Sequence, residues 1–470
     1  MRPFLAILFS FCLVFTSKSQ TWHTMGAGVT NAAGNANVHS ISYYNSKITI
    51  GGYFKSSGST MLNSISQWDG NNWNALGTGL WHDGTPDYAG IVSAITYYDS
   101  VLYVGGGFVV AGGTSAFDMS HSEGNIAKWD GSQWLPMTQW GSDGLNSVCT
   151  KFQVYHNNLY LGGFFNASTD SSGSYFTQGI SKWNDTTFSA IGQFAGNLAP
   201  YGYDAAMALC TYNDKLIAGG FFNSVNGSPY GSYGYIASYN DTTWDSLSSG
   251  LNNVVFSLAV YNGELYAGGN FTATGAGVPV NHVAKWNGTQ WLPVGEGLND
   301  SVWVLCVDSA QNKLYAGGEF TQTGLGAPAK HIAEWTGTNW QEVGGGTNAF
   351  VLSLFAKDSN LYVGGAFTMA GSTPANRIAV WGNNSVGINE PKNTNQFFNI
   401  YPNPANNFID VETEFKNYSI SVFDNMGKLI LRENSNQNKT RINLSPFSNG
   451  IYFIQLQSNG KLVSKKFIKE

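Results

Sequence analysis

The sequence predicts an all-β protein: a seven-bladed β-propeller closed by its N-terminal strand, followed by a small C-terminal β-sandwich. Three observations carry this prediction: a pattern repeated seven times, half a repeat at each end of the repeated region, and a change of composition near residue 383. The chain of 470 residues holds 57 glycines, is 14% aromatic and only 11% charged. Such a composition is typical of many short strands joined by tight turns.

Residues 1–19 have the pattern of a secretory signal peptide. Arg2 supplies a positive charge at the start, and the apolar run over residues 4–15 is too short to span a membrane. Ser17 and Ser19 are small residues at plausible cleavage positions. We therefore expect an exported protein with no transmembrane segment.

The pattern apolar-x-apolar-Gly-Gly-x-Phe occurs seven times in the region that follows. It reads "ITIGGYF" in the first copy and "LYVGGAF" in the last, and successive copies lie 47 to 57 residues apart. Regular self-similarity of this kind indicates one structural unit per copy. The phenylalanines that end the seven copies are Phe54, Phe108, Phe165, Phe222, Phe271, Phe320 and Phe367.

Each copy has the same surroundings, so each unit is predicted to hold four short strands. In the fifth unit these are "SLAVY", "LYAGG", "VAKW" and "QWLPV", and Asn287-Gly288 marks a hairpin turn between the last two. Four-stranded sheets that are apolar on both faces pack around an axis in a β-propeller. We expect the paired glycines to mark a close backbone approach or a bulge, and the paired tryptophans to wedge between sheets.

The seventh unit lacks its fourth strand, because it ends after "IAVW" at residues 378–381. The missing element is found at the other end of the region, as "TWHTMG" at residues 21–26. We predict that these residues form the outer strand of the last unit. Pairing of the two ends closes the ring and leaves no exposed sheet edge. The double glycine with a downstream Tyr or Trp resembles kelch-type propellers, including the central domain of galactose oxidase. The resemblance covers residues 20–382 and implies the fold only.

The composition changes after Trp381. Residues 383–397 are polar and read as a linker, and the alternating apolar strands of residues 398–470 predict a small β-sandwich. The latter segment closely resembles the C-terminal sorting domain of the type IX secretion system of Bacteroidetes-type bacteria. The resemblance implies Sec export, passage across the outer membrane by that machinery, and a secreted or surface-attached product. The matching sorting residues are Tyr401, Pro402, Asn403, Pro404, Gly427, Gly450, Tyr452, Lys465 and Lys466.

Charge separates the two regions and argues against nucleic acid as a partner. Acidic residues outnumber basic ones two to one over residues 20–385, whereas basic residues are in excess over residues 386–470. Nucleic-acid binding needs basic patches, which an acidic propeller does not provide.

No catalytic residue, metal ligand or cofactor site is identified in the sequence. The predicted propeller holds one arginine, Arg377, where a sialidase needs a cluster. Its three cysteines, Cys149, Cys210 and Cys306, form no CxxC motif and lie in apolar runs, so we interpret them as small buried residues.

Three groups of residues permit a functional reading beside a structural one. His282 and His331 precede the third strand in adjacent units and could share a ligand, or could be repeat-derived polar residues. Asp83 and Asp87 could serve hydrolysis, or could be solvated loop charges. Asp-Thr-Thr at residues 185–187 and 241–243 resembles an O-glycosylation signal of this bacterial group, and it is short enough to arise by coincidence.

We interpret the protein as a binding or adhesion module with glycans among its candidate ligands; the alternative is a propeller enzyme, a hydrolase or lyase, that acts on glycans or polysaccharides. Aromatic residues gather in the long loops of units two to four, and flat rings with polar edges suit sugar stacking. The other reading is that these rings bury one another. The candidate ligand-binding residues are Trp81, Tyr88, Trp140, Tyr201, Tyr203, Tyr230 and Tyr233.

Overall fold

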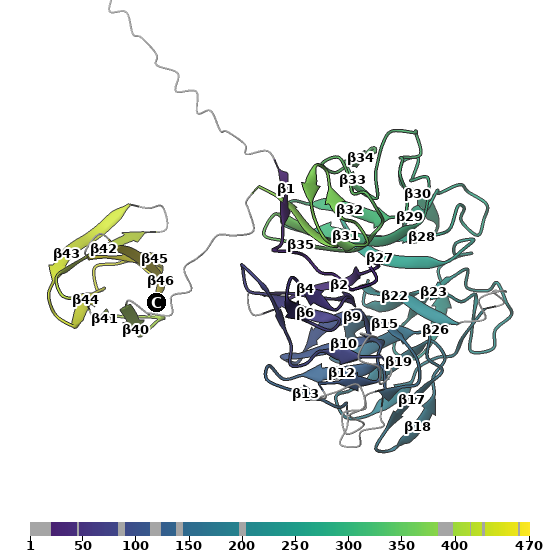
Figure 1. The fold of residues 1–470 in the computed structure, drawn as a ribbon, viewed down its shortest axis with the longest axis horizontal. Coiled ribbons are helices and arrows are strands. Elements are labelled where there is room, and N and C mark those ends of the chain that lie inside the picture. Colours follow the sequence, from purple (N-terminus) through teal and green to yellow (C-terminus); the bar gives the residue numbers. More distant parts are fainter. Residues whose placement is uncertain are drawn as a thin grey trace, which may run out of the picture. The chain divides into compact units, whose positions relative to one another are not determined.

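The fold was obtained as a computed structural model of the chain (Figure 1). The structure describes residues 20–44, 47–82, 90–112, 124–137, 144–196, 204–383, 398–413, 415–424, 428–458 and 461–470. Two compact units divide the chain, residues 1–388 and residues 389–470. All regular elements in the described residues are strands, which confirms the all-β class. None of the described residues belongs to a helix that is long and apolar enough to cross a membrane.

The described part of the first unit contains seven four-stranded antiparallel sheets, which we number 1 to 7 in chain order. In sheets 1 to 6 the four strands follow one another along the chain, as the repeat predicts. The first strands are β2 (Asn37–Tyr44), β9 (Ile91–Tyr98), β15 (Cys149–Tyr155), β22 (Ala205–Tyr212), β27 (Val255–Tyr261), β31 (Val302–Asp308) and β35 (Val351–Lys357). The second strands are β3 (Lys47–Tyr53), β10 (Val101–Gly107), β16 (Asn158–Gly163), β23 (Lys215–Phe221), β28 (Glu264–Gly269), β32 (Lys313–Gly318) and β36 (Asn360–Gly365).

The third and fourth strands complete the sheets. The third strands are β6 (Ile65–Trp68), β12 (Ile126–Trp129), β19 (Ile180–Trp183), β25 (Ile236–Tyr239), β29 (Val283–Trp286), β33 (Ile332–Trp335) and β39 (Ile378–Gly382). The fourth strands are β7 (Trp73–Ala75), β13 (Trp134–Leu135), β20 (Phe188–Ala190), β26 (Trp244–Ser246), β30 (Trp291–Pro293), β34 (Trp340–Glu342) and β1 (Thr21–Thr24).

Short strands lie in the connections between second and third strands and in those between successive sheets. They pair as β4 (Ser56–Ser57) with β5 (Thr60–Met61), β8 (Leu80–Trp81) with β11 (Val110–Ala111), β14 (Gly144–Leu145) with β17 (Ala167–Asp170), β17 also with β18 (Gly173–Phe176), β21 (Phe194–Ala195) with β24 (Ser224–Val225), and β37 (Met369–Ala370) with β38 (Thr373–Pro374).

The N-terminal strand is the fourth strand of sheet 7, as predicted. β1 pairs antiparallel with β39, and the register places Thr21 opposite Gly382 and Trp22 opposite Trp381. The two ends of the repeated region are therefore joined by backbone hydrogen bonds, which removes two sheet edges that would otherwise be open.

The first strands of the seven sheets lie next to one another in chain order, and β35 lies next to β2. Sheet 7 thus contacts sheet 1: the Ser353 hydroxyl donates to the Val38 carbonyl at 3.2 Å. A Cβ added at Gly364 would come within 2.6 Å of the Val38 side chain. Contacts between neighbouring sheets therefore run in order from sheet 1 to sheet 7 and from sheet 7 back to sheet 1.

The paired glycines lie opposite a β-bulge in all seven sheets. In sheet 1 the two glycines Gly51 and Gly52 face Ser40 and Val38, so His39 is the extra residue. A Cβ at Gly52 would overlap the carbonyl oxygen of Asn37 in the same sheet, and a Cβ at Gly51 would overlap Val92 of sheet 2. The prediction of a close backbone approach or a bulge is confirmed, because both occur at the same place.

The aromatic pairs fill the contacts between sheets near the outer strands. Trp129 and Trp134 lie with ring centroids 5.1 Å apart, and the indole N–H of Trp134 donates to the Leu76 carbonyl of sheet 1 at 2.9 Å. The same bond is made to the preceding sheet by Trp22, Trp73, Trp244, Trp291 and Trp340. These tryptophans therefore wedge between sheets, as expected from the repeat.

The second unit has two antiparallel sheets around one apolar core. One sheet has the order β40 (Phe398–Tyr401), β41 (Phe408–Thr413), β44 (Lys439–Asn443), and the other β43 (Leu429–Ser435), β42 (Tyr418–Asp424), β45 (Gly450–Ser458), β46 (Lys461–Lys469). Buried residues from both sheets form the core, among them Val411, Ile420, Ile454 and Phe467. Five large apolar side chains are exposed on the larger sheet: Leu429, Ile430, Ile451, Phe453 and Ile468.

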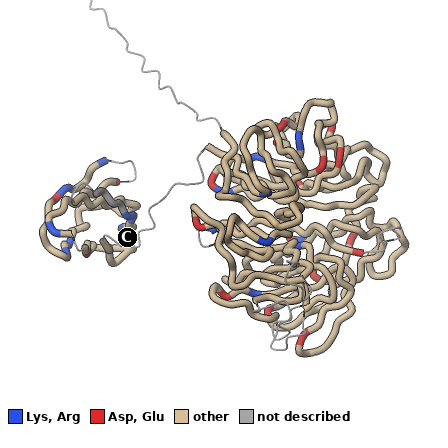
Figure 2. Tube along the Cα trace, in the orientation of Figure 1, with Lys and Arg blue, Asp and Glu red and all other residues tan. Residues whose placement is uncertain are grey.

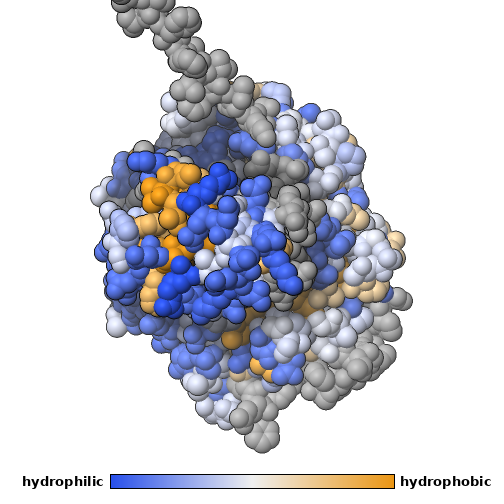
Figure 3. Space-filling model, turned by 90° about the vertical axis from the view of Figure 1, so that its left-hand side faces the viewer, coloured by the Kyte–Doolittle hydropathy of each residue, from blue (hydrophilic) through white to orange (hydrophobic). Residues whose placement is uncertain are grey.

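The two units differ in charge. Figure 2 shows acidic residues prevailing along the first unit and basic residues prevailing along the second, as the sequence predicts. The space-filling view of Figure 3 shows a group of hydrophobic side chains exposed among hydrophilic ones.

Candidate functional site

A cavity of about 570 Å³ is lined mainly by the first strands of the seven sheets. Each of these strands carries the β-bulge described above, and a bulge turns one extra residue out of the ladder. All seven extra residues line the cavity and are half-buried, whereas the residue before each of them is buried. The seven bulged residues are His39, Ser93, Thr150, Met207, Phe256, Trp303 and Leu352.

The bulged residues divide the cavity into a polar and an apolar side. Sheets 1 to 3 contribute His39, Ser93 and Thr150, and sheets 4 to 7 contribute Met207, Phe256, Trp303 and Leu352. Because neighbouring sheets contribute neighbouring bulges, the two kinds of residue form two continuous arcs. A ligand that fits both arcs has one polar and one apolar side.

Aromatic rings make up a large part of the apolar side. Phe256 and Trp303 are stacked, with ring centroids 4.4 Å apart and an angle of 14° between their planes. Phe221 contacts Phe256 at 5.9 Å, and Phe164, which also lines the cavity, contacts Phe221 at 6.0 Å. Among the described residues, the buried Trp303 indole nitrogen has no hydrogen-bond partner, so stacking holds this ring in place.

Lys151 is the one lysine or arginine among the described residues that line the cavity. It follows the bulged Thr150, and its side chain lines the cavity while remaining exposed to solvent. Desolvation in the cavity lowers the pKa of Lys151. The thiols of Cys210 and Cys306 lie close enough to interact with its charge. Burial raises the pKa of both thiols to about 12, so both are uncharged at neutral pH.

Two further titratable groups line the cavity. Burial lowers the pKa of His39 to about 4, so its imidazole is neutral at physiological pH. Glu319 follows the paired glycines of sheet 6, and desolvation together with the nearby Asp300 raises its pKa. Glu319 is the one carboxylate among the described lining residues, as Lys151 is the one lysine or arginine.

The predicted aromatic face is placed only in part. Tyr88, Trp140, Tyr201 and Tyr203 lie outside the described residues, as do Asp83 and Asp87. Trp81 is half-buried in β8 opposite Val110. Tyr230 is 66% exposed.

None of the described residues of this face lines the cavity. Tyr233 packs beside the core of sheet 4 and donates its hydroxyl to the Trp244 carbonyl at 3.0 Å. Phe194, another aromatic residue of the connection between sheets 3 and 4, is fully buried against Phe222, at 4.1 Å between centroids. For Phe194 the reading as a core residue is the correct one.

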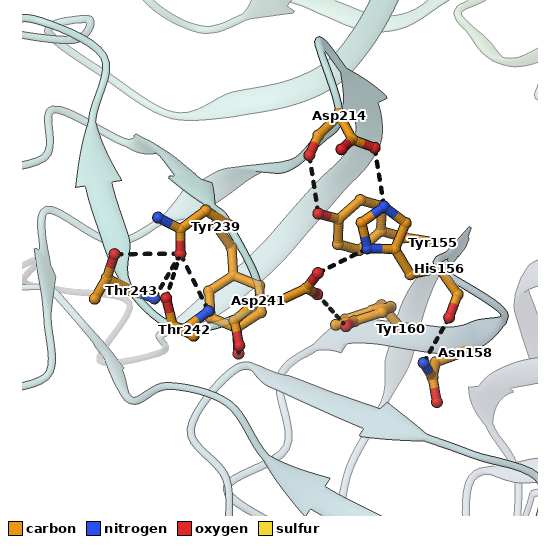
Figure 4. Close-up of polar contacts among 10 residues, drawn as sticks. Tyr155, His156, Asn158, Tyr160, Asp214, Tyr239, Asp241, Thr242 and Thr243 are labelled. Carbon is orange, nitrogen blue, oxygen red and sulfur yellow. Dashed lines mark hydrogen bonds and ion pairs between the residues drawn. The ribbon is translucent and has the colours of Figure 1, made fainter.

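His156 joins two sheets through two carboxylates (Figure 4). Its Nε2 atom lies 2.9 Å from Asp214 and its Nδ1 atom 2.7 Å from Asp241. Tyr155 stacks on the imidazole at 4.0 Å and donates its hydroxyl to the Asp214 carbonyl. Hydrogen bonds to Asp214 and then Asp241 raise the pKa of His156. Since the three side chains come from hairpins of sheets 3 and 4, the cluster ties these sheets together.

The other two sequence features with a possible functional role are the His282 and His331 pair and the Asp-Thr-Thr segments, and the described residues of both make hydrogen bonds within their own sheets or turns. His282 and His331 have φ angles of 69° and 66°, and the equivalent positions in the other units, from Ser64 to Arg377, also have positive φ. Each imidazole Nδ1 lies 3.2 Å from a glycine carbonyl in its own sheet. In the Asp-Thr-Thr segment 241–243, both threonine hydroxyls donate to Asn240.

Several of the predicted sorting residues make hydrogen bonds within the second unit. The Asn403 amide donates to the Lys466 carbonyl and accepts from the Ile468 N–H, at 3.1 and 3.0 Å. Tyr401 donates to Glu412 at 3.0 Å, and the buried Tyr452 donates to the Ser448 carbonyl at 2.8 Å. Pro402, Pro404, Gly450 and Lys465 lie in the same unit, and Gly427 lies outside the described residues.

No group of three His, Cys, Asp or Glu residues is placed to hold a metal ion in the described ranges. The titratable side chains of the described cavity lining, His39, Lys151 and Glu319, come from three different sheets.

Comparison with known proteins identifies the second unit. Residues 399–470 match the family of the secretion system C-terminal sorting domain, which confirms the sorting domain expected from the sequence. Its presence means that the protein is secreted through the type IX system to the cell surface or beyond, and that the secretion machinery is a partner of this domain. No curated protein matches the chain.

Among solved structures, the chain is similar to PorZ of Porphyromonas gingivalis, described as an essential bacterial surface component of the type IX secretion system. The identity is 12% and the TM-score 0.42, over 92% of this chain and 59% of the PorZ chain. This chain therefore spans less than two thirds of the length of PorZ.

Proposed function

We propose that sheets 1 to 7 form a closed, kelch-like, seven-bladed propeller, and that this secreted protein binds a small ligand in the cavity between the first strands. The contacts between sheets that return from β35 to β2 support closure, and so does the pairing of β1 with β39. The sorting domain delivers the propeller to the cell exterior, where a binding module meets ligands from the surroundings.

One observation carries the binding function: the seven bulges have the same geometry and seven different residues. At the facing positions the fold tolerates only glycine, and each sheet has the pair. At the bulges the residues are His39, Ser93, Thr150, Met207, Phe256, Trp303 and Leu352. A position that served only the fold would repeat along with the glycines, so the variation supports a surface shaped for a ligand. The volume is in the range of small-molecule sites.

The alternative of an enzyme that cleaves glycans has weaker support. Glycosidases place two carboxyl groups on either side of the bond that they cleave. The described lining of the cavity supplies one, Glu319. Binding alone does not require a second carboxyl group.

Blocking the cavity tests the proposal. The full chain is screened by thermal shift against neutral sugars, sugar acids and aromatic acids, and hits are repeated with Ser93→Trp and Thr150→Trp. Both residues are half-buried at the cavity, so a large side chain can fill space there without entering the core. We expect Ser93→Trp to keep the melting temperature of the free protein and both variants to lose the ligand-induced shift. Thr150→Trp should also lower the melting temperature, because it removes the hydroxyl that donates to the carbonyls of Gly162 and Ala206.

The predicted aromatic face provides the comparison. In a second variant, Trp81, Trp140 and Tyr201 are replaced by alanine. If this variant loses binding while the cavity-blocked variants retain it, the ligand site lies in the long loops and the proposal of a central site is wrong.

A further inference from the structure

Lys151 differs in kind from its counterparts in the other sheets. The residue that follows the bulge is small in those six strands: Ser40, Ala94, Ala208, Ser257, Val304 and Ser353. The strand geometry is therefore satisfied without a long or charged side chain. In sheet 3 alone this position carries a cation, and it projects from the polar side of the cavity wall.

The charge of Lys151 has no counter-ion within the described residues. None of their ion pairs or hydrogen bonds includes its ammonium group, although Lys285 and Lys313 of the same unit are each paired with a glutamate. An unpaired cation on a cavity wall is free to interact with a ligand that enters the cavity. An anion bound beside it supplies a counter-ion, and hydrogen bonds between opposite charges are about twice as strong as neutral ones.

The bulged residues on the opposite side of the cavity are apolar, and Glu319 of sheet 6 is the one carboxylate among the described lining residues. The stacked rings of Phe256 and Trp303 lie nearly parallel, and Met207 and Leu352 extend this side on sheets 4 and 7. Planar rings bind well on such surfaces because they bury a large area at a small loss of conformational freedom. A ligand that uses both sides carries a negative group at one edge and a flat ring beside it.

We propose that the cavity binds a small organic acid whose carboxylate pairs with Lys151 and whose flat ring packs on the apolar side of the cavity, beside the Phe256–Trp303 stack. The inference rests on the proposed function and specifies its ligand class. Aromatic carboxylates and cyclic sugar acids share this chemistry. At about 570 Å³ the cavity has room for one such molecule.

Calorimetric titration of the full chain tests the ligand class with matched pairs of probes. Indole-3-acetate is compared with its neutral amide, and glucuronate with glucose. We expect at least one acid to bind about tenfold more tightly than its neutral partner. Tighter binding of indole-3-acetate assigns an aromatic acid, and tighter binding of glucuronate assigns a sugar acid.

Substitution of the lysine provides the second arm. Lys151→Met keeps the length of the side chain and removes its charge, so we expect the preference for the acid to disappear while affinity for the neutral partner stays. Lys151→Arg should retain the preference. Lys47→Met, which removes an exposed charge at the start of β3, should change nothing.

The results separate this inference from the proposed function. If neutral probes bind in the cavity and Lys151→Met has no effect on any acid, the ligand class is wrong and the binding site stands. If neither acid binds at millimolar concentration, the ligand class is also wrong. If binding of every probe survives Ser93→Trp and Thr150→Trp, the proposed site itself is wrong.

Discussion

Trp22 and Trp381 stand at opposite ends of the repeated region and form the same pair that neighbouring tryptophans form elsewhere in the fold. Their ring centroids are 5.2 Å apart and their planes are inclined by 54°; for Trp68 and Trp73, which one hairpin joins, the values are 5.1 Å and 52°. The Trp22 indole also donates to Gly344 of sheet 6. The tryptophan pair that one hairpin brings together in sheet 1 is formed in sheet 7 by residues from the two ends of the repeated region.

Removal of residues 20–28 should destabilise the first unit by several kcal/mol, because the deletion exposes the edge of β39 and leaves a cavity where Trp22 was buried. Trp22→Ala alone should cost about 3–5 kcal/mol in the free energy of unfolding, measured by denaturant titration. Trp73→Ala is the matched control, since Trp73 occupies the equivalent position in sheet 1. A melting temperature unchanged by the deletion would contradict closure by the N-terminal strand.

Two neighbouring glycines of sheet 2, Gly106 and Gly107, test the bulge geometry. A Cβ at Gly106 would overlap the Ile91 carbonyl oxygen, whereas a Cβ at Gly107 would lie 3.5 Å from Val148, an ordinary contact. We expect Gly106→Ala to destabilise the protein by about 1–3 kcal/mol or more. Gly107→Ala should be neutral or stabilising by up to about 1 kcal/mol, because alanine restricts the unfolded chain. Thermal unfolding of the two variants measures both effects, and equal losses would rule out the close approach as the cause.

The repeat was sufficient to predict the strands and the pairing of the chain ends. Four strands per unit follow from the alternation around Gly-Gly, and the missing half-repeat after Trp381 pointed directly to Trp22. These features depend on short-range patterns that every unit repeats, so a deviation in one copy does not obscure the pattern. The sorting domain was recognised from short motifs such as Tyr401 to Pro404, which the family match confirms.

The cavity was not predicted, because a bulge changes the register by one residue without leaving a mark in hydrophobic alternation. Trp303 and Phe256 read as ordinary strand aromatics, and Lys151 as one more charge at a strand surface. The sequence does hold a signal: with the seven units aligned on Gly-Gly, the first strands vary at one position, and the next position is small in every unit except the third, which has Lys151. Aromatic residues in the loops are a weaker signal, because Phe194 between sheets 3 and 4 is buried in the core.

The His156 cluster should make stability depend on pH. Because Asp214 and Asp241 raise the pKa of His156 in the folded state, its contribution is fully present below the ordinary histidine pKa of about 6.5. It is lost as the pH rises through the raised value. The lowered pKa values of His39, His282 and His331 act in the opposite sense, so wild type must be compared with His156→Asn. Melting temperatures from pH 5 to pH 9 should differ most at the acid end, and a constant difference would show that the carboxylates do not act on the imidazole.

Deletion of residues 398–470 should leave the first unit folded and confined to the periplasm. The two units are compact separately, and the match to the sorting domain covers nearly the whole deleted segment. Fractionation of cells followed by limited proteolysis measures location and folding together. A finer test is Asn403→Ala, which removes two hydrogen bonds between the sorting motif and the last strand at Lys466 and Ile468. If those bonds hold the motif in the form that the machinery recognises, this variant should be exported less than wild type. Asn449→Ala removes one exposed hydrogen bond, accepted from the Lys469 ammonium group, and should be exported normally. Normal export of the truncated chain would mean that the signal lies elsewhere in the protein.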